Sequence, residues 1–344
     1  MKWNEAALLP LSAVYGAVMH FRTRLYRMGV FKQRRLNGVV ISVGNLTVGG
    51  TGKTPMVIWI AGRLAAEGKG TAILTRGYGS RPAETVEGSG EIAPSELLSD
   101  EVKVMKDHLG DGVAYGVGPG RYQHGLKLQK LGVNWFVLDD GFQHLELARD
   151  VDIVLVDAAF PFGGGHLLPA GRLREPRTSL SRADIIVITR SKHAPAIEAA
   201  IMRDSDAPIY YARPAFGSLC GPQGQRVDVA EVRQRKLFAF CGIGNPAPFV
   251  ADLRDWGFQI VGHKFFADHH RYTQSDAGHL ERAAREAGAA ALICTEKDVF
   301  NLSGIRWTAT DLFVCQISLE IDNAEGFWLS VIAKGELRAA QRRQ

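Results

Sequence analysis

Short apolar runs alternate with segments of helical periodicity along the first 200 residues. The runs are rich in β-branched residues and lack polar alternation, which is typical of strands buried on both faces. We expect strands at 39–43, 71–75, 113–117, 135–138, 153–156 and 185–189. Helices are expected at 53–67, 99–109, 121–131 and 195–203. This alternation predicts an α/β fold with a parallel sheet flanked by helices.

A second block with the same alternation follows a segment at 214–232 that is rich in Gly, Pro and polar residues. We expect its strands at 237–240, 259–261, 290–294 and 312–316, and its helices at 246–256, 274–287 and from 323 onward. The pattern predicts a second, smaller α/β lobe, with an active cleft between the lobes. The expected divisions are 1–36, 37–218 and 219–344, and the last helix could dock back on the first lobe.

The composition describes an ordinary globular protein, with 46% hydrophobic and 22% charged residues in 344. Four cysteines form no C-x-x-C pair, which argues against a disulfide framework or a zinc site and fits a reducing setting. The net charge is a modest +5, and no basic run carries interleaved aromatics along the main part of the chain. We therefore expect no nucleic acid partner.

A glycine-rich loop directly follows the first predicted strand and precedes the first predicted helix. It matches the phosphate-binding pattern G-x-x-x-x-G-K-[ST], except that a threonine replaces the first glycine. Close glycines let successive N–H groups point at an anion, and the helix N-terminus adds its positive dipole end. Lys53 is expected to reach the β- and γ-phosphates, and Thr54 to bind Mg²⁺. The loop predicts binding of a nucleoside triphosphate, against the plainer alternative of a Gly-rich turn, by Thr47, Gly49, Gly50, Thr51, Gly52, Lys53 and Thr54.

Two adjacent carboxylates, Asp139 and Asp140, end the predicted strand at 135–138. A phosphate-loop enzyme needs an Asp opposite the loop to hold Mg²⁺, directly or through water. Asp-Asp-Gly is also good turn chemistry, so a plain turn is the alternative. The loop upstream favours the metal site.

Three further polar groups each have an ordinary explanation. Asp100 opens a predicted helix, where acids stabilise the first turn. His269 and His270 follow Asp268 in a predicted loop, where an Asp–His pair could orient an imidazole for acid–base work. Residues 168–176 hold two arginines and a carboxylate, which suit either a solvated loop or a phosphate or metal contact.

The N-terminal segment is apolar and then basic. Residues 6–19 carry no charge, but such a helix spans only about 21 Å against a hydrocarbon core of about 30 Å. Leu8, Leu11, Tyr15 and Val18 lie roughly on one helical face, and arginines follow. This predicts a helix in the membrane interface. A core-docked helix and a nucleic-acid arm are the alternatives.

Six motifs occur in order along nearly the whole chain: 43–55 (VGNLTVGGTGKTP), 76–78 (RGY), 99–101 (SDE), 138–144 (LDDGFQH), 168–176 (LPAGRLREP) and 266–270 (FADHH). With them the chain resembles the tetraacyldisaccharide 4′-kinases, the lipid A 4′-kinases of Gram-negative bacteria. The resemblance implies a P-loop NTPase-like kinase that uses ATP and Mg²⁺. It implies transfer of the γ-phosphate to the 4′-hydroxyl of the lipid A disaccharide 1-phosphate, at the cytoplasmic face of the inner membrane. We expect a peripheral membrane protein that acts as a monomer.

The resemblance also implies roles for individual residues. Lys53 and Thr54 would serve the phosphates and the metal, and Asp100 would act as base on the sugar hydroxyl, paired with His269. Mg²⁺ would lie among Thr54, Asp139, Gln143 and Glu175. The phosphates or the sugar would be lined by Tyr78, Arg121, Asp140, His144 and Arg174. The choice between His269 and His270 stays open.

A nucleotide-switched ATPase of the partitioning and septum-placement type is the rival from another class. Such proteins carry a signature lysine in the phosphate loop, where this chain has Val48. The function of such a switch also does not explain the Asp268–His270 motif in a second lobe. The kinase is the favoured reading.

Overall fold

The computed structural model describes residues 3–77, 85–87, 98–307 and 310–342. Contacts between Cα atoms divide the chain into two compact units. The first holds Met1–Ser99, Met105–Arg213 and Leu319–Gln344, and the second holds Asp100–Val104 and Pro214–Ser318. The last helix of the chain thus belongs to the first unit. The three divisions expected from the sequence remain a prediction.

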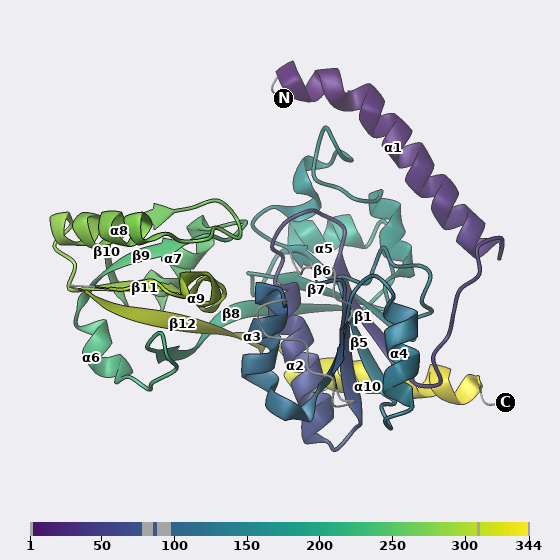
Figure 1. Cartoon of the computed structure of the whole chain (residues 1–344). Coiled ribbons are helices and arrows are strands. Elements are labelled where there is room, and N and C mark those ends of the chain that lie inside the picture. Colours follow the sequence, from purple (N-terminus) through teal and green to yellow (C-terminus); the bar gives the residue numbers. More distant parts are fainter. Residues whose placement is uncertain (1–2, 78–84, 88–97, 308–309, 343–344) are drawn as a thin grey trace. The chain divides into compact units, whose positions relative to one another are not determined.

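The first unit is built on a largely parallel sheet (Figure 1). Its order is β3-β4-β2-β5-β1-β6-β7-β8, and among these described strands β3 alone runs antiparallel to its neighbour, β4. The residues of β1, β2, β5, β6 and β7 are buried throughout. The strands are β1 (Val39–Asn45), β2 (Thr71–Thr75), β3 (Thr85–Glu87), β4 (Ala114–Val117), β5 (Trp135–Asp139), β6 (Val151–Asp157), β7 (Ile185–Thr189) and β8 (Ile209–Cys220).

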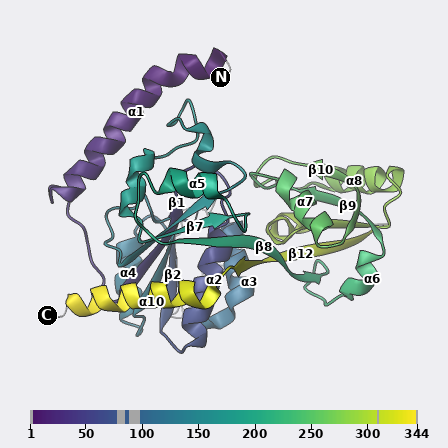
Figure 2. The same ribbon diagram turned by 180° about the vertical axis from the view of Figure 1, so that it is seen from behind.

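Helices line both faces of this sheet, as Figures 1 and 2 show from opposite sides. On one face, Leu128 of α4 joins a core with Val40, Phe136 and Leu138. On the other, Gly335 of α10 lies so close to Val39 that a side chain there would clash. The helices are α2 (Lys53–Ala66), α3 (Asp100–Leu109), α4 (Arg121–Gln129), α5 (Pro195–Ile201) and α10 (Ala324–Gln341). The predicted parallel sheet flanked by helices is confirmed.

The second unit has a parallel sheet in the order β10-β9-β11-β12, with a hydrophobic core on each side. Its strands are β9 (Lys236–Cys241), β10 (Gln259–Phe265), β11 (Ala291–Thr295) and β12 (Asp311–Ile321). Its helices are α6 (Val229–Arg233), α7 (Ala247–Asp255), α8 (Gln274–Glu286) and the short α9 (Glu296–Val299).

The segment expected as an irregular boundary at 214–232 is in part regular structure. Strand β8 continues to Cys220, and α6 begins at Val229. Pro214 and Gly217 lowered the strand signal, but β12 lies beside this stretch and Ser318 Oγ donates to the Ala215 carbonyl at 3.2 Å. Both β8 and β12 run from one unit into the other. A partner strand about a hundred positions away therefore overrides local composition.

Helix α1 (Trp3–Arg27) docks on the first unit along one face only. Ser12 Oγ donates to the Leu167 carbonyl at 2.9 Å, and Tyr15 OH donates to the Arg174 carbonyl at 3.0 Å. The predicted lipid-facing stripe was wrong in including Tyr15, which faces the protein. The exposed apolar face consists of Leu11, Val14, Val18 and Phe21. No helix in the described part of the chain is long and apolar enough to cross a bilayer.

Candidate active site

The phosphate loop connects β1 to α2 in a shape that its glycines permit. Gly49 has a φ of 120°, and Gly52, the N-cap of α2, has a φ of 86°. Both values lie in the left-handed region that side chains disfavour, so these glycines allow the loop to curl. Asn45 Nδ2 donates to Thr51 Oγ1 at 2.9 Å, and Thr189 Oγ1 donates to the Thr51 carbonyl at 3.2 Å. Hydrogen bonds therefore attach the loop to the ends of β1 and β7. The N-terminus of α2 that follows the loop is a suitable site for an anion.

The loop is also fastened to the segment that carries the predicted arginine and glutamate. Val48 N–H donates to the Arg172 carbonyl at 2.9 Å, and Arg174 N–H donates to the Leu46 carbonyl at 2.7 Å. These two backbone bonds bring Arg174 and Glu175 beside the start of the loop. The sequence separates the two segments by more than a hundred residues.

Lys53, Asp140 and Arg174 form a charged cluster at the first turn of α2. Lys53 Nζ lies 3.6 Å from Asp140 Oδ1, and Arg174 Nη1 donates to both Asp140 oxygens at 2.9 and 2.7 Å. Burial alone would raise the pKa of Asp140, but Lys53, Arg174 and Arg121 outweigh it and lower that pKa. Asp140 is thus ionised and offsets part of the positive charge of Lys53 and Arg174.

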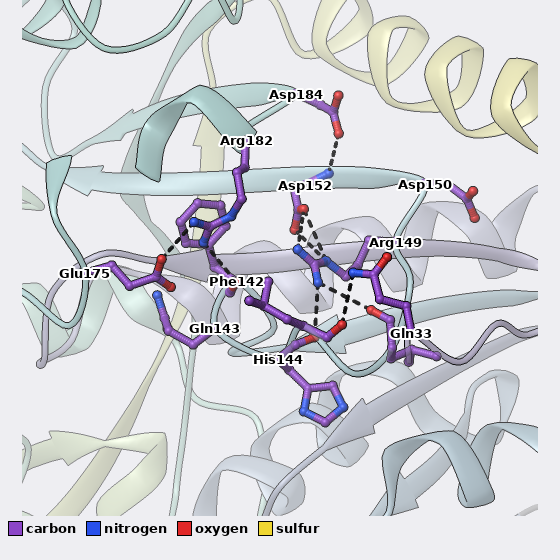
Figure 3. Close-up of polar contacts among 12 residues, drawn as sticks. Gln33, Phe142, Gln143, His144, Arg149, Asp150, Asp152, Glu175, Arg182 and Asp184 are labelled. Atoms are coloured by element: carbon purple, nitrogen blue, oxygen red, sulfur yellow. Dashed lines mark hydrogen bonds and ion pairs between the residues drawn. The ribbon is translucent and has the colours of Figure 1, made fainter. Parts of the chain in front are cut away.

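Three predicted metal residues flank the end of β1. Asp139 lies opposite Val43 in the sheet and accepts a hydrogen bond from Thr75 Oγ1 at 2.9 Å. Gln143 Nε2 donates to the Asn45 carbonyl at 3.0 Å. Glu175 is almost fully buried, and its Oε2 lies 2.8 Å from Arg182 Nη1 (Figure 3). Neither Glu175 oxygen accepts a properly oriented hydrogen bond from the described residues.

These residues fit Mg²⁺, which typically takes one or two carboxylates and completes its shell with water and substrate phosphates. A buried carboxylate oxygen without a donor is a suitable ligand for a hard cation. Thr54, the second residue of α2, is also buried beside the loop. Within the described ranges, no three His, Cys, Asp or Glu side chains gather as a metal cluster, so any Mg²⁺ site here depends on other oxygens as well.

A cavity of about 600 Å³ adjoins the charged cluster in the first unit. Arg121, at the start of α4, is buried and its Nη1 donates to the Asp140 carbonyl at 3.4 Å. Burial and then the charges of nearby arginines lower the pKa of His144 to about 4, so its imidazole is neutral at pH 7. The excess of cations suits an anionic ligand. The cavity is lined by Tyr15, Met19, Val48, Arg76, Pro119, Arg121, Asp140, Gln143, His144, Leu168 and Arg174.

The second unit brings Asp100, His269 and Asn301 together. His269 Nδ1 lies 3.2 Å from Asp100 Oδ2, and Asn301 Nδ2 donates to the same oxygen at 2.8 Å. Burial alone would raise the pKa of Asp100, but hydrogen bonds from His269 and Asn301 outweigh it and lower that pKa. The hydrogen bond with Asp100 is the main reason that the pKa of His269 is raised.

His270 makes a different contact from its neighbour. Its Nε2 lies 3.2 Å from Asp276 Oδ2, and its ring stacks on Phe266 with centroids 4.6 Å apart. The geometry therefore pairs His269, and not His270, with Asp100.

The sequence reasoning missed several residues at these sites. Asn45 and Thr75 are the last residues of buried strands. A polar residue directly after an apolar run could have marked each of them as a candidate site residue. Asn301 and Arg182 carry no such signal. The partner of Asn301, Asp100, lies far away in sequence, and the partner of Arg182, Glu175, lies on the other side of a turn. Tyr78, expected to line the cleft, lies outside the described residues.

A phosphate loop on a parallel sheet, with a lysine, paired acids and arginines at the strand ends, defines the class of P-loop nucleotide-binding α/β enzymes. A family model described as tetraacyldisaccharide-1-P 4′-kinase matches residues 4–334. The chain belongs to the tetraacyldisaccharide 4′-kinase family. The predicted kinase is thereby confirmed, and the nucleotide-switched ATPase is not favoured.

Tetraacyldisaccharide 4′-kinases from other bacteria are similar in sequence to this chain over most of its length. A tetraacyldisaccharide 4′-kinase of Geobacter sulfurreducens is 42% identical over 305 residues, covering 87% of this chain and 84% of the relative. One of Anaeromyxobacter dehalogenans is 39% identical over 310 residues, covering 86% and 81%. The crystal structure of LpxK from Aquifex aeolicus in complex with ATP is 29% identical, with a TM-score of 0.75, and covers 96% of this chain and 99% of its own.

Proposed function

We propose that this chain transfers the γ-phosphate of ATP to the 4′-hydroxyl of tetraacyldisaccharide 1-phosphate in lipid A biosynthesis. The observation that carries the proposal is the cluster of Lys53, Asp140 and Arg174 at the head of the phosphate loop, beside a cationic cavity. Phosphoryl transfer through a loose transition state needs mainly positioning and neutralisation of charge. A lysine, two arginines and a helix N-terminus supply both.

The loop would bind the nucleotide. Its backbone N–H groups from Gly49 to Gly52 surround the phosphates, and Lys53 neutralises the β- and γ-phosphates. Asp140 keeps Lys53 and Arg174 close together before the nucleotide arrives, because it contacts both. The site is therefore arranged in advance for an anion.

Thr54, Asp139, Gln143 and Glu175 would hold Mg²⁺. When bound, the ion withdraws negative charge from the phosphate oxygens. Thr75 fixes the Asp139 carboxylate, and the backbone carbonyl of Asn45 fixes the Gln143 amide. Both side chains are thus held in one orientation.

Asp100 would accept the proton of the sugar hydroxyl, with His269 as its partner. A hydroxyl is a poor nucleophile at pH 7, and a positioned carboxylate is the usual remedy. The pKa of Asp100 is lowered, so its carboxylate is in the ionised form that a proton acceptor requires. In the tautomer with a proton on Nδ1, His269 donates to Asp100 and orients it.

The cavity residues would contact the acceptor and its phosphate. Arg121, His144 and Arg174 offer donors to an anionic group, and Asp140 sets the direction of Arg174. Tyr78 is proposed for the same role from the resemblance alone.

Helix α1 would attach the enzyme to the cytoplasmic face of the inner membrane as a monomer. Its exposed stripe offers an apolar face, and Arg24 and Arg27 are exposed near its end. Apolar burial and attraction to anionic headgroups act together in such helices. The acceptor's acyl chains can then stay in the bilayer during the reaction.

ADP release tests the proposal. Purified enzyme with ATP, Mg²⁺ and the tetraacylated disaccharide 1-phosphate in detergent should release ADP at a rate that depends on the acceptor. Lys53→Ala is the control for the site, and a mixture without lipid is the control for hydrolysis. Equal release with and without the acceptor would contradict the proposal.

A further inference from the structure

Glu175 is a buried carboxylate whose surroundings are unusual. Its side chain is 1% exposed, so it has lost nearly all of its hydration. A carboxylate in such a place needs a partner of opposite charge. Neither of its oxygens accepts a hydrogen bond of good geometry from a described residue. Within the described part of the chain, an ion pair with Arg182 compensates its charge.

Arg182 is itself held in place. It is the last residue of the 3-10 turn Arg177–Arg182, and its side chain is 12% exposed. Its guanidinium carbon lies 4.3 Å from the centre of the Phe142 ring, and Nη2 donates to the Phe142 carbonyl at 3.5 Å. Figure 3 shows the Arg182 guanidinium over the Phe142 ring, with a dashed line to the Glu175 carboxylate.

This contact links two loops that carry proposed metal ligands. Phe142 lies in the segment from Asp139 to Gln143, and Glu175 lies in the segment that is fastened to the phosphate loop. The ion pair with Arg182 holds the Glu175 carboxylate, and neither of its oxygens accepts a hydrogen bond from a described residue. The arrangement therefore fixes the position of the Glu175 carboxylate and leaves its lone pairs available to a cation.

We propose that Arg182, stacked on Phe142, is a positioning residue that holds the Glu175 carboxylate in place and so presents it to Mg²⁺. The inference rests on the proposed function, because it takes Glu175 as a metal ligand. Partners behind a metal ligand commonly matter for metal affinity nearly as much as the ligand itself.

A lysine keeps the charge but cannot reproduce the planar stack and the fixed direction of the guanidinium. The Arg182→Lys variant therefore keeps the charge that neutralises Glu175 but loses the group that positions its carboxylate. Arg177→Lys is the matched control on the same turn. The guanidinium carbon of Arg177 lies 4.6 Å from the centre of the Phe162 ring, and its Nη2 lies 2.8 Å from Asp204 Oδ2. These partners are not among the proposed metal ligands.

The melting midpoint of the full chain is measured at a fixed ATP concentration while Mg²⁺ is increased. The readout is the Mg²⁺ concentration that gives half of the maximal rise in that midpoint. We expect Arg182→Lys to raise this concentration about tenfold, at the low end of the range for residues behind a ligand. The Arg177→Lys variant should match the wild type. The unshifted melting midpoint of Arg182→Lys without ligand should stay close to that of the wild type.

A double-mutant cycle without ligand tests the pair itself. Arg182→Met leaves a buried carboxylate uncompensated and should lower the melting midpoint. Adding Glu175→Gln should restore much of that loss, because the charge has gone. If Arg182→Met does not fold, the Arg182→Lys titration still decides.

The outcomes separate this inference from its premise. A normal Mg²⁺ requirement in Arg182→Lys with a raised one in Glu175→Gln overturns the positioning role and leaves the proposed function standing. A normal requirement in Glu175→Gln overturns Glu175 as a ligand, and with it this inference. An unaltered ATP shift in Lys53→Ala overturns the proposed nucleotide site.

Discussion

His269 Nδ1 and Asn301 Nδ2 both contact one oxygen of Asp100, Oδ2, at 3.2 and 2.8 Å. The other carboxylate oxygen, Oδ1, accepts no hydrogen bond from the described residues. The same carboxylate thus has one oxygen that is oriented and one that could accept a proton. The first predictions follow from this difference between the two oxygens.

Asp100→Ala should lower turnover by roughly 10²–10⁴-fold with little change in ATP binding, as expected for loss of a general base. His269→Ala should have a comparable effect, and the double variant should lose much less than the product of the two. His270→Ala is the matched control, because His270 pairs with Asp276 instead. Steady-state kinetics with purified variants measures all four. Fully multiplicative losses would argue against a working pair.

The pKa of His269 should fall toward its ordinary value of 6.5 in Asp100→Asn, because the hydrogen bond with Asp100 is the main cause of its elevation. An NMR titration of the imidazole C–H signals measures this, with His270 as the internal control. An identical His269 titration in the variant would show that Asp100 does not set it.

The pair should also make stability depend on pH. The folded pKa of Asp100 is lowered, so its contribution is present above the unfolded value of about 3.9 and lost as pH falls through the folded value. The folded pKa of His269 is raised, so its contribution is complete below about 6.5 and lost as pH rises through the folded value.

Urea unfolding of wild type and His269→Gln should therefore differ most between about pH 4 and 6.5, and converge at alkaline pH. The difference should be small, because the His269 side chain is 48% exposed. A constant difference across the whole range would contradict the ion pair.

Lys53→Ala should abolish nearly all transfer while the fold is kept. The ammonium group neutralises the migrating phosphoryl group, an effect worth roughly 3–4 kcal/mol or 10²–10³-fold in comparable sites. Lys297→Ala, at a partly exposed position in the second unit, is a matched loss of charge. Circular dichroism confirms folding, and phosphate transfer gives activity. Retention of more than about a tenth of activity would refute the role of Lys53.

Replacing Val14, Val18 and Phe21 together by serine should weaken co-flotation with anionic vesicles and activity on the lipid acceptor, but leave ATP binding intact. These side chains are exposed on α1, opposite the face that carries Ser12 and Tyr15. Leu337→Ser, at an exposed apolar site on α10, is the control. Binding of the wild type should loosen as salt rises, because screening acts within about 8–10 Å. Flotation that salt cannot reduce would contradict an interfacial helix.

The buried strands and the phosphate loop could be predicted because their signals are local. Val39–Asn45 is mostly apolar and β-branched, and Gly49 and Gly52 of the loop stand where the backbone needs a positive φ. Element ends differ by only a few residues, as with α2, which stops at Ala66. These features depend on neighbours in the sequence.

The rest depended on distant partners. The sequence pattern predicts no strand at 209–220, where β8 lies between β7 and β12, and the contact of Asn301 with Asp100 joins residues 201 positions apart. Likewise, no pattern in α1 distinguishes Tyr15, which bonds to Arg174, from the exposed Val14. Helical periodicity gives a face but does not say which face the rest of the chain covers.

The position of the transferred phosphate tests the central claim most directly. The purified chain is incubated with ATP, Mg²⁺ and tetraacyldisaccharide 1-phosphate, and the product is analysed by phosphorus–proton correlation NMR. The account predicts a second phosphomonoester coupled to the proton at carbon 4′, absent when Lys53→Ala replaces the wild type. Phosphate at any other carbon, or release of inorganic phosphate with the acceptor unchanged, would contradict it.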